Sequence, residues 1–243
     1  MGYQLGKLPP KHDDRNLRLG TYLTVDLPKA PPKVETYKRV ALWPMMKNDE
    51  LGDCTIAGAG HMIQDWTAAC GREVIPADSA ILDAYWRVAE GRDGGAVMLD
   101  VLKMWRKRGI ANHRILAFAE LDHDSKGQLQ HAIHLFGAAY LGLALPDYAV
   151  RNDPLKTPWT HTGDAPPNPQ NGHCVCAVGY GPTSIYVVTW GKLKPMSYAF
   201  YRKYNDESYA CLSRDWINAM LGTSPLGFDL QTLQADLVKV ARA

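Results

Sequence analysis

Two short segments about 120 residues apart constrain this chain more than any other feature. The first, residues 48–57, carries Cys54 where a polar, glycine-containing turn gives way to a helical pattern. The second, residues 172–181, places His173 at the head of a strand-like run that ends in Gly-Tyr-Gly. A cysteine nucleophile and its histidine base are commonly distant in sequence and adjacent in the fold. Together the two segments predict a thiol-dependent acyl-transfer site.

Composition excludes several other classes of protein. The chain has 243 residues, 46% of them hydrophobic and 21% charged, so it can bury a sizeable core as one large domain or two small lobes. A net charge of +2 with both signs interspersed does not favour a nucleic-acid partner. No apolar run reaches the length of a membrane span, and the N-terminus lacks the apolar stretch of a signal peptide. We therefore expect no nucleic acid, no membrane and no signal peptide, and a location in the cytoplasm or in a larger particle.

The five cysteines do not suggest a disulfide framework, because an odd number is scattered over a long chain. Cys174 and Cys176 stand two apart in a strand and therefore point to the same face, and with His173 they raise the question of a metal site. No second ligand pair with zinc spacing accompanies them. This favours small buried core cysteines and no metal.

The order of predicted elements indicates an α+β architecture. Helical patterns cover residues 54–70, 77–90, 97–109 and 129–136, and Asp229 begins a last amphipathic helix. Strand-like runs are predicted at residues 138–145, 174–180, 185–190, 198–204 and 208–212. A helical lobe followed by a mainly antiparallel β lobe leaves a cleft between them.

Three segments follow from this layout. Residues 1–45, rich in proline and charge, form an extended arm that docks on its own domain or on a neighbour. Residues 46–112 form the helical lobe with Cys54. Residues 113–243 form the β-rich lobe with His173 and a C-terminal helix, and the proline-containing loop 151–172 delivers that histidine.

The motifs resemble those of papain-like cysteine peptidases over roughly residues 40–191. Residues 47–57 are similar to the family's segment from an oxyanion-hole Gln to the nucleophile, and the run 173–181 matches its His-x-Val-x-x-Val-Gly-Tyr-Gly strand. Asp93-Gly94-Gly95 resembles the wall along which substrate backbone pairs, and residues 185–191 resemble the next strand with its Ser-Trp-Gly end. Asp13 and Arg15 of the arm are also family-like.

The resemblance assigns roles to particular residues. It implies Cys54 as nucleophile, His173 as base and Asn48 as oxyanion donor. Gly94, Gly95 and Trp190 would line the substrate site. It also implies a peptide or related amide substrate and no cofactor.

The chemistry of these residues is consistent with those roles. A helix N-terminus and a nearby imidazolium both lower a cysteine pKa from its ordinary value of roughly 8.5. We therefore expect a lowered pKa for Cys54, a sulfur within roughly 3–5 Å of a His173 ring nitrogen, Asp53 as the helix cap and the Asn48 amide at the same cleft. His61 lies about 10 Å farther along the helix, too far to be the base.

The sequence departs from the family at four positions. The family's His-orienting Asn is replaced by Val188, for which Thr189 is the best substitute and Asn171 another. The oxyanion Gln is replaced by the shorter Asn48. Thr55 follows the nucleophile in place of an aromatic residue, and Leu51 stands in the place of a disulfide cysteine, which fits a reducing compartment.

Two functional classes therefore remain open. The leading interpretation is a papain-like thiol hydrolase that uses Cys54 and His173. The alternative is a catalytically impaired protein on the same frame, with a structural or binding role in a larger assembly such as a virus or phage particle. In that role the arm and the C-terminal helix would lie on protein neighbours.

Overall fold

The computed structural model describes residues 3–18, 29–151, 153–217, 222–227, 229 and 231. Within them, seven strands form a single sheet in the order β1-β2-β7-β3-β4-β5-β6. The strands are β1 (Leu17–Arg18), β2 (Ile115–Glu120), β3 (Ala139–Ala144), β4 (Gly172–Tyr180), β5 (Ser184–Thr189), β6 (Lys192–Ser197) and β7 (Asn205–Ser213). Neighbouring strands are antiparallel except β1 and β2, which are parallel.

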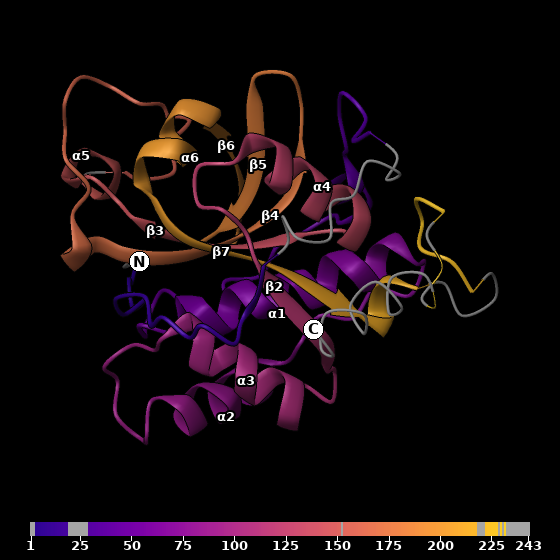
Figure 1. The fold of residues 1–243 in the computed structure, drawn as a ribbon. Helices are drawn as coiled ribbons and strands as arrows, with labels where there is room; N and C mark the ends of the chain where they lie inside the picture. The colour runs from indigo at the N-terminus through magenta and orange to yellow at the C-terminus, as the bar shows by residue number, and fades with distance from the viewer. Residues whose placement is uncertain are drawn as a thin grey trace.

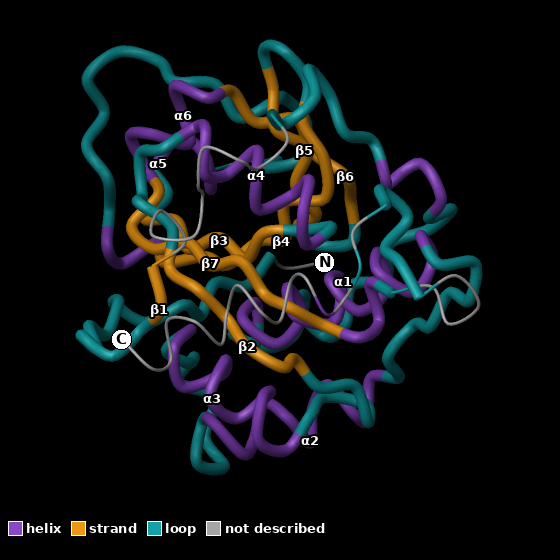
Figure 2. The backbone as a smooth tube through the Cα atoms, turned by 45° about the vertical axis from the view of Figure 1, so that its right-hand side comes forward, coloured by secondary structure: helices purple, strands orange, loops and turns teal. Residues whose placement is uncertain are grey.

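Helices cover both faces of this sheet. Figures 1 and 2 show α1 (Cys54–Ala69), α2 (Asp78–Val88) and α3 (Met98–Arg108) on one side, and α4 (Lys126–Phe136) and α6 (Tyr198–Tyr204) on the other. The short α5 (Asp147–Val150) follows β3. Three 3-10 helices cover Thr36–Arg39, Pro169–Asn171 and Arg214–Trp216.

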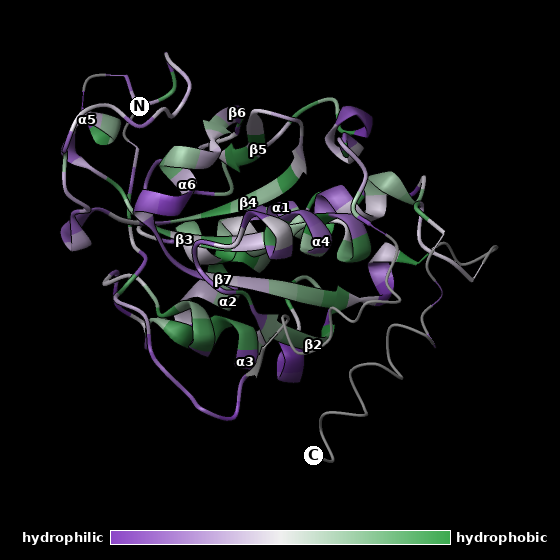
Figure 3. Ribbon diagram, turned by 45° about the horizontal axis from the view of Figure 1, so that its top comes forward, coloured by the Kyte–Doolittle hydropathy of each residue, from purple (hydrophilic) through white to green (hydrophobic). Residues whose placement is uncertain are grey.

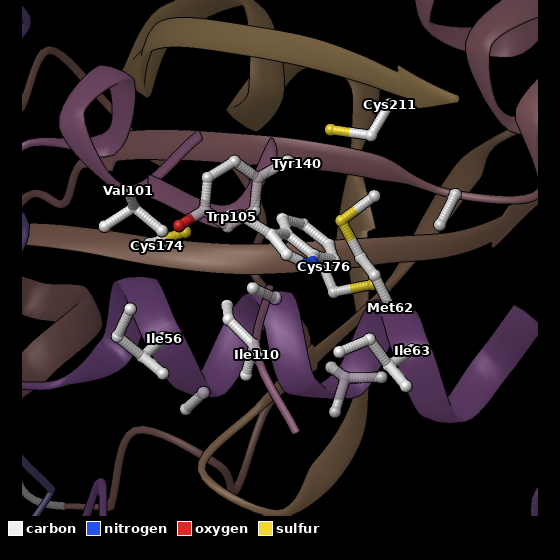
Figure 4. Packing of buried hydrophobic residues seen from close by; sticks show 14 of the residues in the cluster. Ile56, Met62, Ile63, Val101, Trp105, Ile110, Tyr140, Cys174, Cys176 and Cys211 are labelled. Carbon is white, nitrogen blue, oxygen red and sulfur yellow. The ribbon is translucent and has the colours of Figure 1, made fainter. Parts of the chain in front are cut away.

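Strand β4 divides the core into two clusters. Its side chains alternate between faces, so Cys174 and Cys176 join the cluster around α1, while Val175 and Ala177 join the cluster under α4 and α6. Figure 4 shows both cysteines beside the α1 side chains. All nine β4 residues are buried, which explains the mostly hydrophobic colour of this strand in Figure 3. The sequence of a strand that is covered on both faces is typically a continuous apolar run.

Helix α1 runs through the middle of the molecule. All 16 of its residues are buried, including the polar His61, whose Nε2 lies 2.9 Å from the Pro44 carbonyl oxygen. The hydroxyl of Tyr140 on β3 donates to the Thr55 carbonyl. Contacts of this kind fix the start of α1 against β3 and β4, where the sequence places the candidate site.

Most predicted elements are confirmed, including the α+β architecture and the shared face of Cys174 and Cys176. The predicted strand at residues 198–204 is wrong, because this segment forms α6. Ser197 caps α6 by accepting from the Phe200 N–H, and the apolar residues Phe200, Tyr201 and Tyr204 repeat at helical spacing. Strands β2 and β6 were not predicted, and the predicted C-terminal helix lies outside the described residues.

Candidate active site

Cys54 is the first residue of α1, as the sequence predicted. The expected capping role of Asp53 is wrong: its side chain caps nothing, and its backbone carbonyl accepts the N–H groups of Ile56 and Ala57. The Asp53 carboxyl is fully buried, and burial, with Asp93 nearby, raises its pKa to about 8. The helix start therefore carries a buried acid directly before the cysteine.

The Cys54 thiol is enclosed. Its side chain is 1% exposed, and its Sγ accepts a hydrogen bond from the Cys174 backbone N–H at 3.4 Å. Burial raises the Cys54 pKa to about 12, although the backbone N–H groups of Cys174 and Lys7 act in the opposite direction. The expected lowered pKa is therefore wrong for this form of the protein, because desolvation outweighs the groups that favour a thiolate.

His173 is held on one side by a polar contact and on another by an aromatic ring. Its Nε2 lies 2.7 Å from Thr189 Oγ1, and its ring stacks on Trp190 with centroids 4.2 Å apart. Among the described residues its Nδ1 has no hydrogen-bond partner. Burial lowers the His173 pKa to about 3, so the imidazole is neutral near pH 7. The histidine and the thiol are thus both uncharged here.

Strand geometry explains why Thr189 reaches this histidine and its neighbour does not. Val188 is 1% exposed and packs in the α1-side cluster, whereas Thr189 is one residue farther along β5 and on the opposite face. The other suggested substitute, Asn171, instead donates to the Leu145 carbonyl and to Asp147. Thr189 therefore occupies the position that the sequence left open, beside the imidazole.

Asn48 lies in a tight turn before α1. Its Nδ2 donates to the Leu51 carbonyl at 3.2 Å, and Met46 and Lys47 have left-handed backbone conformations. Its side chain also lies close enough to lower the pKa of Asp53 against the larger effect of burial. One of its two amide hydrogens is thus engaged within the turn.

The cleft between Cys54 and the opposite wall is filled by the chain's own N-terminus. We call residues 3–9 the cleft segment. Hydrogen bonds of its backbone reach both walls of the cleft. On the helical side, Gln4 N donates to Asn48 O, Leu8 N to Ala96 O, and Ala96 N to Gly6 O. On the β side, Gly6 N and Lys7 N donate to Gly172 O, and Trp190 Nε1 donates to Gln4 O. The arm was expected to dock on its own domain or on a neighbour, and these residues of it contact their own domain.

Glycines allow this close approach. A Cβ on Gly6 would lie 1.8 Å from the Gly52 carbonyl oxygen, and one on Gly95 would lie 2.2 Å from the Gly6 oxygen. A Cβ on Gly172 would lie 2.0 Å from the Lys7 oxygen. A hollow of about 440 Å³ remains beside the segment, lined among others by Gly52, Gly94 and Gly95. The cleft is therefore built to receive a peptide backbone.

The other predicted binding residues lie around the same segment. Gly95 adjoins Gly6, and its N–H donates to the Tyr85 hydroxyl. Gly94 lines the remaining hollow, and Trp190 both stacks on His173 and binds the Gln4 carbonyl.

Sequence reasoning missed the contribution of the cleft segment and of the residues that receive it. Lys7 is buried and forms ion pairs with Asp206 and Glu207 at the start of β7. Glycines at positions 6, 52, 95 and 172, spread over four separate segments, were the available signal, because they are typical of places where backbones meet closely. The sequence alone does not show that these four positions converge.

A group of three or more His, Cys, Asp or Glu side chains that could hold a metal is absent from the described residues. All five cysteines are free. No described helix is long and apolar enough to cross a membrane.

The fold is that of papain-like cysteine proteases. Xylellain, a cysteine protease from Xylella fastidiosa, superposes with a TM-score of 0.65 at 16% identity, over 87% of this chain and 97% of xylellain. Digestive procathepsin L 3 of Tenebrio molitor gives 0.59 at 13% identity, over 86% and 76% of the chains. The Carica candamarcensis cysteine protease CMS1MS2, solved with E-64, gives 0.57 at 14%, over 75% and 98%. No family model matches the sequence, and no curated protein matches it.

Proposed function

We propose that this chain is a thiol hydrolase of peptide or related amide bonds, with Cys54 as nucleophile and His173 as its base. Thr189 positions the imidazole, Asn48 supplies an oxyanion donor, and Gly94, Gly95 and Trp190 bind the substrate backbone and shield the histidine. The observation that carries the proposal is the cleft segment. An extended peptide already lies over the Cys54 thiol, hydrogen-bonded to both walls of the cleft.

The tautomer of His173 supports the role of base. When Nε2–H donates to Thr189 Oγ1, the Nδ1 lone pair is left to accept the thiol proton. The Cys54 sulfur then attacks the carbonyl carbon, and the oxyanion that forms is stabilised by an amide N–H of Asn48 and backbone donors at the helix start. The proton passes from Nδ1 to the leaving amine, and water hydrolyses the thioester.

The segment must leave before this chemistry begins. The Lys7 backbone N–H faces Cys54, whose thiol is buried and neutral, and His173 is neutral as well, so the form described here is latent. Gly6→Ala offers a way to expel it, because the added methyl collides with the Gly52 carbonyl while every residue of the proposed machinery is kept. Departure of the segment rehydrates the pair and restores the conditions under which a helix N-terminus lowers a cysteine pKa.

Hydrolysis by the full-length protein tests the proposal. We expect Gly6→Ala protein to cleave quenched fluorescent peptides faster than wild type, and Cys54→Ala in the same background to cleave none. Failure of the open variant to cleave peptides, amides or esters would reject the hydrolase.

The second candidate is a binding or structural protein on the papain-like frame. The filled cleft favours it, since a segment that never leaves makes the site inert. In that case the segment would stay in place under all native conditions, and Gly6→Ala would lower stability without producing any activity. The two candidates therefore give opposite results in the same experiment.

A further inference from the structure

A buried carboxylate, Glu207, and a partly exposed one, Asp206, form a pocket for a cation beside the cleft. Asp206 and Glu207 follow Asn205, the first residue of β7, and the Lys7 Nζ lies 2.9 Å from Asp206 Oδ2 and 3.3 Å from Glu207 Oε1. The side chain of Glu207 is 3% exposed and that of Lys7 is 1% exposed. Charges buried to this degree are costly unless they are paired, so the pocket is specific for a cation.

The shape of the pocket comes from the β lobe and not from the lysine. A Cβ on Gly142 of β3 would lie 2.3 Å from Lys7 Cε and 2.7 Å from Glu207 Cγ, so the missing side chain provides the room for a long aliphatic stem. The Tyr209 hydroxyl donates a hydrogen bond to the second carboxylate oxygen of Glu207, Oε2, at 2.9 Å. Asn205 donates to the Gly142 carbonyl at 2.7 Å, which ties β7 to β3 at this point.

The pocket has one unused acceptor atom. Among the described residues, the buried Asp206 Oδ1 accepts no hydrogen bond, while Glu207 Oε1 contacts the Lys7 ammonium at 3.3 Å. An ammonium or a guanidinium can use such acceptors, and a guanidinium brings five donors.

The pocket opens at the reactive end of the cleft. The backbone N–H of Lys7 donates to Gly172 O, one residue before His173, and it also faces the Cys54 thiol. Any peptide that follows this path therefore places one side chain at the mouth of the carboxylate pocket.

We propose that the pocket formed by Gly142, Asp206 and Glu207 is a specificity site for a lysine or arginine side chain of a peptide bound in the cleft, and that Lys7 is its resident occupant. This inference rests on the proposed function for its substrate, but the binding it predicts can be measured without catalysis.

The test uses full-length Gly6→Ala protein, in which the cleft segment is displaced, and peptides added in trans. The probe is the acetylated amide Tyr-Gln-Leu-Gly-Lys-Leu-Pro, which copies residues 3–9. Matched peptides carry arginine, norleucine or glutamate in place of the lysine. Calorimetry is expected to give at least ~10-fold tighter binding for the lysine and arginine peptides than for the norleucine peptide, because only they pair with Asp206 and the buried Glu207.

A second variant separates the pocket from the backbone contacts. Glu207→Gln in the Gly6→Ala background keeps the size of the side chain, and it should reduce the preference for lysine over norleucine to about 3-fold or less. Equal binding of the lysine and norleucine peptides, an unchanged preference in the Glu207→Gln protein, or no binding to a protein whose Cys54 is readily alkylated would each overturn the proposal.

The same peptides distinguish failure of this inference from failure of the hydrolase. A preference for basic peptides with no cleavage of any peptide supports the pocket and rejects the hydrolase. Cleavage without a preference for basic residues supports the hydrolase and rejects the pocket.

Discussion

The Cys54–His173 site and the Lys7 pocket lie next to each other, and Cys54, His173, Lys7 and Glu207 are all buried, yet the two regions differ in charge state. In the pocket, a cation faces two carboxylates, and the charges compensate one another. At the site, burial raises the pKa of the thiol and lowers that of the imidazole, so both groups are neutral. Burial does not decide ionisation by itself; a partner of opposite charge does.

This contrast explains how one segment can silence the other site. Lys7 supplies the charge that the pocket needs, and the backbone around it excludes water from the thiol. Under the proposed function, the ion pairs of Lys7 thus hold the segment over Cys54 and keep the hydrolase latent. Substitutions in the pocket or in the segment should therefore change the reactivity of Cys54 in a predictable direction.

The largest effect is expected from Gly6→Ala. Its methyl group cannot be accommodated 1.8 Å from the Gly52 oxygen, so the segment leaves and the thiol is rehydrated. Return of the Cys54 pKa from about 12 toward or below roughly 8.5 should raise the rate of alkylation by iodoacetamide at pH 7 by ~1000-fold. Gly127→Ala is the matched control, since a Cβ there meets nothing within 4 Å, and it should leave the rate unchanged.

Lys7→Met should have the next largest effect. Removing one partner of a buried ion pair costs about 3–5 kcal/mol while the other charges stay buried. Release of the segment lets water reach Asp206 and Glu207, so we expect Cys54 alkylation to accelerate by ~100-fold. Lys11→Met, which removes an exposed pair with Asp100, should change it by less than ~3-fold. Slow alkylation in Lys7→Met protein would mean that the backbone contacts alone hold the segment.

The pH dependence of stability should report the buried His61. Burial lowers its pKa from the ordinary 6.5 to about 4, so the unfolded chain takes up a proton first as the pH falls. Its contribution is therefore complete above about pH 6.5 and is lost as the pH falls toward 4, by ~3 kcal/mol. Urea unfolding at several pH values measures this as a steeper decline for wild type than for His61→Gln. Contributions of Asp53 and Asp65, which run in the opposite direction because burial raises their pKa, are common to both proteins and cancel. Parallel curves would contradict the prediction.

Thr189→Val should give the smallest of these effects. The hydrogen bond between Thr189 and His173 contributes about 0.5–1.5 kcal/mol to holding the imidazole in its orientation. Without it, Cys54 alkylation in the Gly6→Ala background should slow by ~10-fold, and the pH profile of alkylation should shift. Thr189→Ser keeps the hydroxyl and should restore the rate. Val188→Asn is not expected to help, because that side chain points into the α1-side core and would bury an unpaired amide.

The sequence predicted what depends on local pattern. The start of α1 at Cys54, the two-sided burial of β4 and the shared face of Cys174 and Cys176 follow from periodicity. The prediction for residues 198–204 was wrong because their four aromatic residues are typical of a strand. The Ser197 side chain instead caps a helix at this point. Strand β6 escaped prediction because Lys192, Lys194 and Pro195 are typical of a sheet edge, which is where it lies.

The candidate site was only partly predictable for a different reason. Cys54, His173 and Thr189 could be named from motifs and spacing, but the burial that leaves the pair neutral could not, and neither could the contact of Cys54 with a segment about 50 residues upstream. Neither the position of Lys7 in the cleft nor its partners on β7 leave a local pattern. Long-range contacts of this kind become visible only in the folded chain.

The central claim is that Cys54 and His173 form a reactive pair which the cleft segment keeps neutral. Its most direct test is the labelling of Gly6→Ala protein by iodoacetamide at pH 6, with each cysteine followed by mass spectrometry. We predict that Cys54 is labelled well ahead of the other four cysteines, and that adding His173→Ala abolishes this advantage. Equally slow labelling of all five cysteines in the folded Gly6→Ala protein would contradict the claim.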